Sequence, residues 1–249
     1  MENKILIVIP ARMKSKRLPN KPLIKLNGKH LIQWTYEACL TSKLADKLII
    51  ATDSQEIKDC VEDFGGEAIL TSIEHKTGSD RVAEVAEKSP EYNIVINVQG
   101  DNPLITGRMI DSLIECLIKN PEIQMAALKS KITKKEDLTN PSIIKVVTDK
   151  NNFALYYSRA VIPYNRDEQK IDYYRNEGVY GFRRDFLLKY VKMPQGELEK
   201  AESLEQLRAL EQGYRIYVVE TDTETFDVNV QEDIKIVEEK LKERMLKEC

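Results

Sequence analysis

The first half of this 249-residue chain alternates short, continuous apolar runs with amphipathic stretches of helical period. The runs have the character of strands buried on both faces, and they lie at residues 5–9, 47–51 and 93–98. The amphipathic stretches predict helices at residues 31–40, 55–64, 81–88 and 109–119. Strands and helices in this alternation predict an α/β fold with a mostly parallel, doubly wound sheet.

The second half of the chain is less regular. Two strands joined by a tight turn are expected at residues 143–147 and 153–157, and a polar loop or lid at 163–174. The other predicted elements are a strand at 179–182, helices at 185–190 and 203–211, a strand at 214–220 and a charged helix at 230–247. Because no repeat or low-complexity linker divides the chain, we expect a single domain over residues 1–249, with a smaller subregion at about 130–195.

The amino-acid composition argues against several classes of function. The 38 basic and 41 acidic residues give a formal net charge of −3, so no overall field attracts nucleic acid. The sequence lacks an apolar run of the ~20 residues that a membrane span needs and has no signal-like start, so we expect a cytoplasmic protein without a membrane partner. Four scattered cysteines without a CxxC pair are expected to be reduced thiols, and two histidines argue against a zinc site.

A strongly basic loop follows the first predicted strand. Its five cationic residues lie between Pro10 and Leu23, and they are Arg12, Lys14, Lys16, Arg17 and Lys21. In an open α/β sheet, ligands bind beyond the carboxyl ends of the strands, so these cations are expected where a polyphosphate would bind. The loop lacks the P-loop pattern of a glycine-rich turn followed by Lys-Ser/Thr. A solvated basic loop is the alternative interpretation.

A second polar motif, at residues 97–103, ends the third predicted strand with the sequence Asn-Val-Gln-Gly-Asp-Asn-Pro. It presents the Gln99 amide and the Asp101 carboxylate at the same edge of the sheet. A carboxylate after a buried strand is a common Mg²⁺ ligand in nucleotide enzymes, because Mg²⁺ prefers hard oxygen and substrate phosphates. Gly-Asp-Asn-Pro is also good turn chemistry by itself, so a plain turn remains an alternative.

Several blocks of sequence together resemble a known family. They run in order along nearly the whole chain, at residues 9–23, 51–53, 75–81, 97–103, 145–147, 154–163, 178–183 and 204–208. The ordered set resembles the 3-deoxy-manno-octulosonate (Kdo) cytidylyltransferases, also called CMP-Kdo synthetases. More distantly, it is similar to the acylneuraminate cytidylyltransferases.

The resemblance implies a Rossmann-like nucleotidyltransferase fold with a smaller region that forms a homodimer. It also implies Mg²⁺-dependent transfer of CMP from CTP to a 2-keto-3-deoxy sugar acid, with release of pyrophosphate, for bacterial surface polysaccharide synthesis. Matching positions implies that the CTP phosphates contact Arg12, Ser15 and Lys21, with Arg12, Lys21 and Asp101 as the catalytic residues. The cytosine is expected near Thr77, Gly78 and Ser79, and the sugar acid near Gln99, Arg159, Asn176, Tyr180, Glu205 and Gln206.

General chemistry agrees with this implied reaction. Direct displacement at the α-phosphorus depends on positioning and charge neutralisation more than on a covalent nucleophile. The sequence contains no Ser-His-Asp or Cys-His pattern that would supply such a nucleophile.

One departure from the family concerns the sugar acid. Kdo enzymes usually carry a histidine where this chain has Asn176, whose amide both donates and accepts hydrogen bonds. We therefore expect a shifted preference among sugar acids. Use of a nonulosonic (sialic-type) acid, or a nucleotide-binding module whose active site has decayed, remain the alternatives.

A second departure concerns the metal. In Kdo enzymes a second Mg²⁺ ligand is an aspartate near the chain end, and the aligned residue here is Asn229, with Asp227 in place of a glycine. Residues two apart in an extended segment share a face, so we predict Asp101 and Asp227 as the charged metal ligands, assisted by Asn229. The alternative is that Asp227 only caps the helix that begins near Val230.

Overall fold

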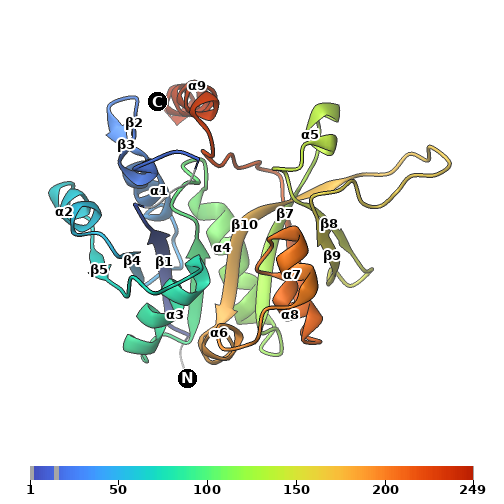
Figure 1. Cartoon of the computed structure of the whole chain (residues 1–249), viewed down its shortest axis with the longest axis horizontal. Helices are drawn as coiled ribbons and strands as arrows, with labels where there is room; N and C mark the ends of the chain where they lie inside the picture. Colours follow the sequence, from blue (N-terminus) through green and yellow to red (C-terminus); the bar gives the residue numbers. More distant parts are fainter. Residues whose placement is uncertain (1–2, 14–16, 249) are drawn as a thin grey trace.

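The structure is a computed structural model that describes residues 3–13 and 17–248. Its centre is a nine-stranded sheet (Figure 1). Seven strands follow the order β11-β7-β10-β6-β1-β4-β5, and the remaining two, β8 and β9, form a hairpin attached through β10. The parallel part contains β1 (Ile5–Ala11), β4 (Lys47–Thr52), β5 (Ala68–Leu70) and β6 (Ile94–Val98). The predicted α/β class and mostly parallel sheet are therefore confirmed.

Strand β1 is buried on both faces, as its apolar run predicts. Ile5, Ile7 and Ile9 belong to one hydrophobic core. That core includes residues of α1 (Leu31–Cys39), α2 (Gln55–Asp63) and α4 (Gly107–Lys119). Leu6 and Val8 belong to a second core, which includes residues of α3 (Gly78–Lys88), α6 (Arg184–Tyr190) and α8 (Leu207–Glu211). Helices on both faces are what a continuous apolar strand requires.

The order of the strands reverses at β1. The chain runs from β1 to β4 and β5 on one side, and it returns to β6 on the other side of β1. A ligand site in a doubly wound sheet lies outside the carboxyl ends of the strands at such a switch point. The basic loop after β1 and the Asp101 motif after β6 both begin there.

Beyond β6 the sheet differs from the prediction in two strands, because β7 was not predicted and β10 is longer than expected. β7 (Met125–Lys131) has few β-branched residues, but its first six residues are buried, and it pairs with β10 and β11 (Ile216–Thr221). β10 (Tyr174–Arg183) is antiparallel to β6 and β7 and is much longer than the predicted strand at 179–182. Tertiary pairing here outweighs local propensity.

The predicted helix at 203–211 is confirmed only in its second half, as α8 (Leu207–Glu211). Residues 203–206 are not helical, and they separate α8 from α7 (Glu197–Glu202). Ser203 has a φ of +53°, a left-handed conformation that a helix cannot contain. The apolar period across the break arises because Leu204 and Leu207 both pack into the second core.

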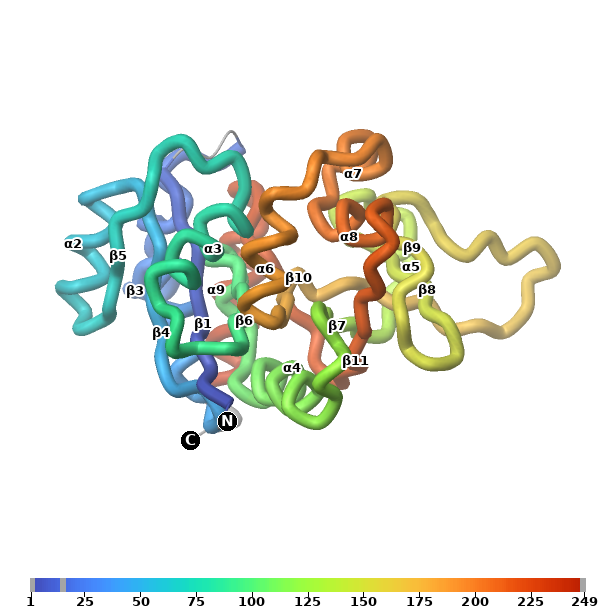
Figure 2. The backbone as a smooth tube through the Cα atoms, turned by 90° about the horizontal axis from the view of Figure 1, so that it is seen from below, coloured from blue at the N-terminus to red at the C-terminus, as the bar shows by residue number. Residues whose placement is uncertain are grey.

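The expected hairpin in the second half is confirmed. β8 (Lys145–Thr148) and β9 (Ala154–Ser158) pair antiparallel, and β8 also pairs with the start of β10. After β9, residues 159–173 form a loop that extends away from the sheet, at the opposite end of the molecule from α2 (Figure 2). Helix α5 (Lys135–Thr139) precedes the hairpin.

The last helix, α9 (Gln231–Glu248), lies beside a small hairpin made of β2 (Lys25–Leu26) and β3 (Lys29–His30) (Figure 1). A short 3₁₀ helix, η1 (Lys21–Leu23), precedes that hairpin. A smaller apolar group lies between these elements, and we call it the C-terminal cluster: Leu18, Leu26, Leu31, Leu104, Val228, Val237 and Leu241. No helix in the described part of the chain combines the length and the apolar character that crossing a bilayer requires.

Candidate active site

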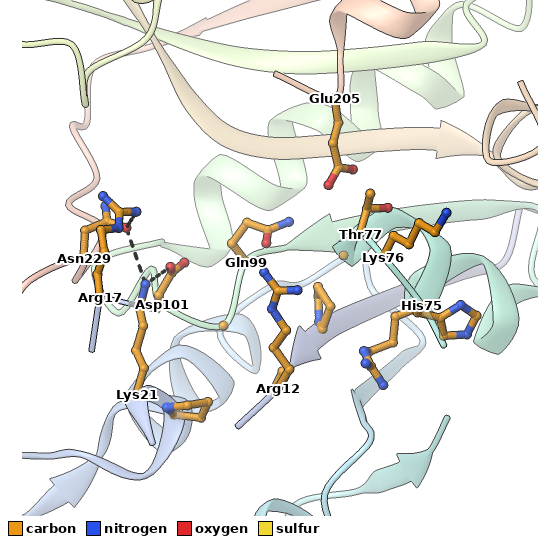
Figure 3. Close-up of a pocket in the computed structure, with 16 residues that line it drawn as sticks. Arg12, Arg17, Lys21, His75, Lys76, Thr77, Gln99, Asp101, Glu205 and Asn229 are labelled. Carbon is orange, nitrogen blue, oxygen red and sulfur yellow. Dashed lines mark hydrogen bonds and ion pairs between the residues drawn. The ribbon is translucent and has the colours of Figure 1, made fainter. Parts of the chain in front are cut away.

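A pocket of about 850 Å³ opens at the carboxyl ends of β1 and β6, where the strand order reverses (Figure 3). Five parts of the chain line it. They are Pro10–Arg12 with Arg17, Lys21 and Pro22; His75–Gly78 with Arg81; Gln99–Asp101; and the single residues Glu205 and Asn229. The pocket therefore joins the basic loop, the N-terminus of α3 and the Asp101 motif, as the sequence analysis predicted.

Lys21 is at the centre of a polar cluster on one side of the pocket. Its ammonium forms an ion pair with Asp101 and lies 3.5 Å from Asn229 Oδ1 (Figure 3). Arg17 donates to the same Asn229 oxygen at 2.8 Å. The backbone N–H of Val228 donates to the carbonyl of Asp101 at 2.9 Å. The C-terminal segment is thus held directly beside the Asp101 motif.

Asp227 lies next to this cluster but does not line the pocket. Its Oδ1 atom is buried and has no hydrogen-bond partner among the described residues. Burial and the nearby charge of Asp101 raise the pKa of Asp227 to about 8. The backbone N–H groups of Asn229 and Val230 donate to Asp233 Oδ2 at 2.7 and 2.9 Å, so Asp233 stabilises the start of α9. The alternative interpretation of Asp227 as the helix cap is therefore wrong.

The oxygen atoms in this region fit a hard divalent cation. Asp101 and Asn229 both contact Lys21, Asp227 lies near enough to Asp101 to feel its charge, and the unpartnered Oδ1 of Asp227 is an acceptor that a cation would satisfy. Among residues 3–13 and 17–248, no cluster of three or more His, Cys, Asp or Glu forms a complete metal site. Two carboxylates and an amide match the usual Mg²⁺ arrangement, in which water and substrate phosphates supply the remaining ligands.

The N-terminus of α3 forms another wall of the pocket. Thr77 Oγ1 accepts from the Asp80 backbone N–H at 3.1 Å, and Asp80 Oδ2 accepts from the Thr77 N–H at 3.0 Å. These reciprocal bonds form a capping box that fixes the start of the helix. At Gly78, an added Cβ would lie only 3.3 Å from Pro10 and 3.4 Å from Gln99, so glycine lets these walls approach closely.

Replacing Thr77 by alanine is expected to lower the free energy of unfolding by about 1 kcal/mol, because the cap of α3 loses its acceptor. Urea denaturation followed by circular dichroism measures the change. Thr77→Ser keeps the hydroxyl and is the matched control. A Thr77→Ala protein as stable as Thr77→Ser would show that the cap contributes nothing.

Glu205 faces the pocket across from the basic loop (Figure 3). Ser79 Oγ donates to Glu205 Oε2 at 2.6 Å, and burial raises the pKa of Glu205. Gln99 Nε2 donates to Asn97 Oδ1 at 3.1 Å, which orients the Gln99 amide at the pocket floor. Ser79 is itself buried, so it acts through Glu205 rather than lining the pocket.

The other residues predicted to contact the sugar acid do not line this pocket. The Arg159 guanidinium donates to the carbonyls of Glu202 at 2.7 Å and Pro141 at 2.9 Å. Asn176 Nδ2 donates to the Tyr180 hydroxyl at 2.9 Å, and Gln206 is buried. Their assignment to the sugar acid stays a prediction. Ser15 lies outside the described residues.

The pocket residues without a predicted role include three basic side chains around the start of α3: His75, Lys76 and Arg81. Arg81 is almost completely buried and forms an ion pair with Asp53 at 2.8 Å, at the end of β4. His75 Nε2 lies 2.5 Å from Glu84 Oε2. The three residues lie around the capped start of α3. The concentration of basic residue types just before and within this predicted helix was the signal that could have found them.

A doubly wound sheet with a basic loop and paired carboxylates at its switch point defines a nucleotide-binding α/β protein. Residues 6–221 match the family model described as "Cytidylyltransferase", and the chain belongs to that family.

Similar proteins were found across nearly the whole chain. The 3-deoxy-manno-octulosonate cytidylyltransferase of Fusobacterium nucleatum subsp. nucleatum is 48% identical over 244 residues, which cover 98% of this chain and 99% of that protein. The protein of that name from Trichlorobacter lovleyi is 43% identical, with 96% and 99% covered. A solved structure of CMP:2-keto-3-deoxy-manno-octonic acid synthetase complexed with CTP matches with a TM-score of 0.92 and 38% identity, covering 97% of this chain and 100% of that one.

Proposed function

We propose that this protein transfers CMP from CTP to Kdo and releases pyrophosphate. The observation that carries the proposal is the similarity, over nearly the whole chain, to a CMP-Kdo synthetase structure complexed with CTP. The pocket chemistry supports it, because cations after β1 and oxygen ligands after β6 meet at one site. The corresponding biological role is the supply of an activated sugar acid for bacterial surface polysaccharide synthesis.

The side chains of the pocket have separate roles in a direct displacement at the α-phosphorus of CTP. Arg12 and Lys21 line the pocket as cations that can bind the triphosphate and stabilise charge on the departing pyrophosphate. Glu205, across the pocket from the basic loop, and Gln99, between them, offer hydrogen-bonding groups for sugar hydroxyls (Figure 3). A Mg²⁺ ion held by Asp101, Asp227 and Asn229 would neutralise phosphate charge when bound. The residues thus act by positioning and charge, and no covalent intermediate is required.

The test is to incubate the purified protein with CTP, MgCl₂ and Kdo while measuring pyrophosphate release. ATP, GTP and UTP replace CTP in control reactions, and a nonulosonic acid replaces Kdo. The proposal requires pyrophosphate release with CTP and Kdo well above all of these controls. Turnover only with the nonulosonic acid would identify a different substrate, and turnover with no acid in the panel would favour a decayed nucleotide-binding module.

Asn176→His is expected to change the preference among sugar acids by altering the buried contact with Tyr180. In the structure the Asn176 Oδ1 atom is buried without a hydrogen-bond partner among the described residues, so this position has an acceptor to offer. The measurement is kcat/KM for Kdo and for other 2-keto-3-deoxy acids, for wild type and variant. Equal values for Kdo in both proteins would show that position 176 is neutral.

A homodimer in the cytoplasm completes the proposal. The hairpin and the loop after it carry exposed apolar side chains at Leu155, Tyr164 and Ile171, which support an interface on the subregion. Light scattering coupled to size-exclusion chromatography measures the mass in solution. A monomer at all concentrations used in the assay would contradict the dimer.

A further inference from the structure

The C-terminal cluster joins the three segments that carry the polar groups of the active site. Leu18 lies between Arg17 and Lys21 in the basic loop, and Leu104 follows Asp101 by three positions. Val228 lies between Asp227 and Asn229. These three apolar side chains pack together with Val237 and Leu241 of α9, apart from the two main cores. The segments therefore share an apolar support beneath the pocket.

Helix α9 is tied to the same region by polar contacts far from the reacting groups. The Asn27 N–H, in the turn between β2 and β3, donates to Glu238 Oε1 at 3.0 Å, and the Asn27 side chain donates to the Glu238 carbonyl at 2.9 Å. Arg244 donates to the carbonyl of Ile105, just after the Asp101 motif, at 3.1 Å. α9 thus spans from the β2–β3 turn to the segment that follows β6.

The apolar packing of the C-terminal cluster is important because the polar contacts of the active site stabilise the arrangement of these segments only weakly. Arg17 is exposed and Lys21, Asp101 and Asn229 are partly exposed, and such contacts typically contribute little to stability. Val228, Val237 and Leu241 are by contrast almost completely buried, so their packing holds the segments in place.

We propose that α9 is a positioning element of the active site, which holds Leu18, Leu104 and Val228 together and thereby sets the spacing of Lys21, Asp101 and Asn229. The inference rests on the proposed function, since it assumes that CTP binds this pocket. Coupling between two sites is reciprocal, so bound CTP stabilises α9 in its docked position to the same extent that docked α9 strengthens CTP binding.

The main test compares two leucines on the same helix. Leu241 is 2% exposed in the C-terminal cluster, whereas Leu246 is 79% exposed. Leu241→Ala is expected to weaken CTP binding and to lower kcat/KM about 10- to 100-fold, because small displacements of positioned groups are costly. Leu246→Ala, the matched control, is expected to leave both quantities unchanged. CTP binding is measured by calorimetry without sugar acid, so that no turnover occurs.

A second set of measurements reports on the docking of α9 directly. Trp34 is the single tryptophan of the chain; it packs against the C-terminal cluster and donates to the Leu26 carbonyl at 2.7 Å. Its fluorescence reports on the packing of the cluster. Trypsin has five cleavage sites within the helix, at Lys235, Lys240, Lys242, Arg244 and Lys247. CTP with MgCl₂ is expected to slow cleavage of wild-type α9 at least about threefold and to slow it less in Leu241→Ala.

The outcomes separate a positioning role from a purely structural one. If α9 only stabilised the fold, CTP would not protect it from trypsin, and the inference would be overturned. A Leu241→Ala protein with altered Trp34 fluorescence but wild-type CTP affinity would also overturn it. Glu238→Ala, which removes the side-chain acceptor for the Asn27 N–H but keeps the backbone carbonyl, makes the same test if Leu241→Ala does not fold. A wild-type protein that binds no CTP would instead contradict the proposed function.

Discussion

Replacing Lys21 by alanine is expected to remove roughly 2 to 4 kcal/mol of transition-state stabilisation, the range seen when a single preorganised charge-stabilising group is lost. Lys21 belongs to the basic loop and contacts both Asp101 and Asn229, so it connects that loop with the proposed oxygen ligands. The effect should be seen in kcat/KM for CTP, measured by pyrophosphate release. Arg12→Ala is expected to have an effect of the same order, because Arg12 lines the pocket from the other side of the loop.

Lys25→Ala is the matched control for the Lys21 prediction. Lys25 is exposed in β2, four residues further along the same segment, and it does not line the pocket. The Lys25→Ala substitution removes the same charge from the protein as Lys21→Ala does, but it removes no side chain from the pocket. Small and equal effects of Lys21→Ala, Arg12→Ala and Lys25→Ala would restore the interpretation of a solvated basic loop.

Asp227→Asn is expected to raise the MgCl₂ concentration needed for half-maximal rate by at least about tenfold, because even indirect contacts to a metal ligand have effects of this size. The variant keeps the shape of the side chain but removes the second carboxylate beside Asp101. Asn229→Asp, in contrast, is expected to be tolerated. The measurement is a titration of the rate with MgCl₂ at saturating CTP and sugar acid.

Asp222→Asn provides the control for the metal prediction. Asp222 lies in the same segment, and its side chain is 73% exposed. It should leave the MgCl₂ titration unchanged. If Asp227→Asn behaves like Asp222→Asn while Asn229→Asp sharply raises activity, then Asn229 occupies the true ligand position and Asp227 is a bystander.

Much of the fold could be predicted from the sequence, because the signals are local. A continuous apolar run such as residues 5–9 requires cover on both faces of the strand, and amphipathic segments between such runs supply it. The predicted strands and helices up to Lys119 are confirmed with small shifts at their ends. The basic loop and the Asp101 motif were found in the same way, since each follows directly on a predicted strand.

The structure differs from the prediction where the partners that pair or pack together are distant in the sequence. The buried strand β7 has weak strand propensity and exists because it pairs with β10 and β11. The left-handed Ser203 interrupts the helical backbone just before Leu204 and Leu207, which pack into the same core, and no local pattern could reveal this break. A period shows which face is buried, but it does not show whether the backbone is continuous.

The sequence by itself determined the class of sheet, the position of the basic loop and the residue types that a nucleotide site requires. The tertiary structure alone decided which of those groups meet. Arg17 and Asn229 are 212 positions apart and yet form a hydrogen bond, and Asp233 rather than Asp227 stabilises the start of α9. Such contacts depend on how α9 packs onto Leu18, Leu104 and Val228. That packing is a sum of many small apolar contacts between distant segments, and it leaves no local pattern in the sequence.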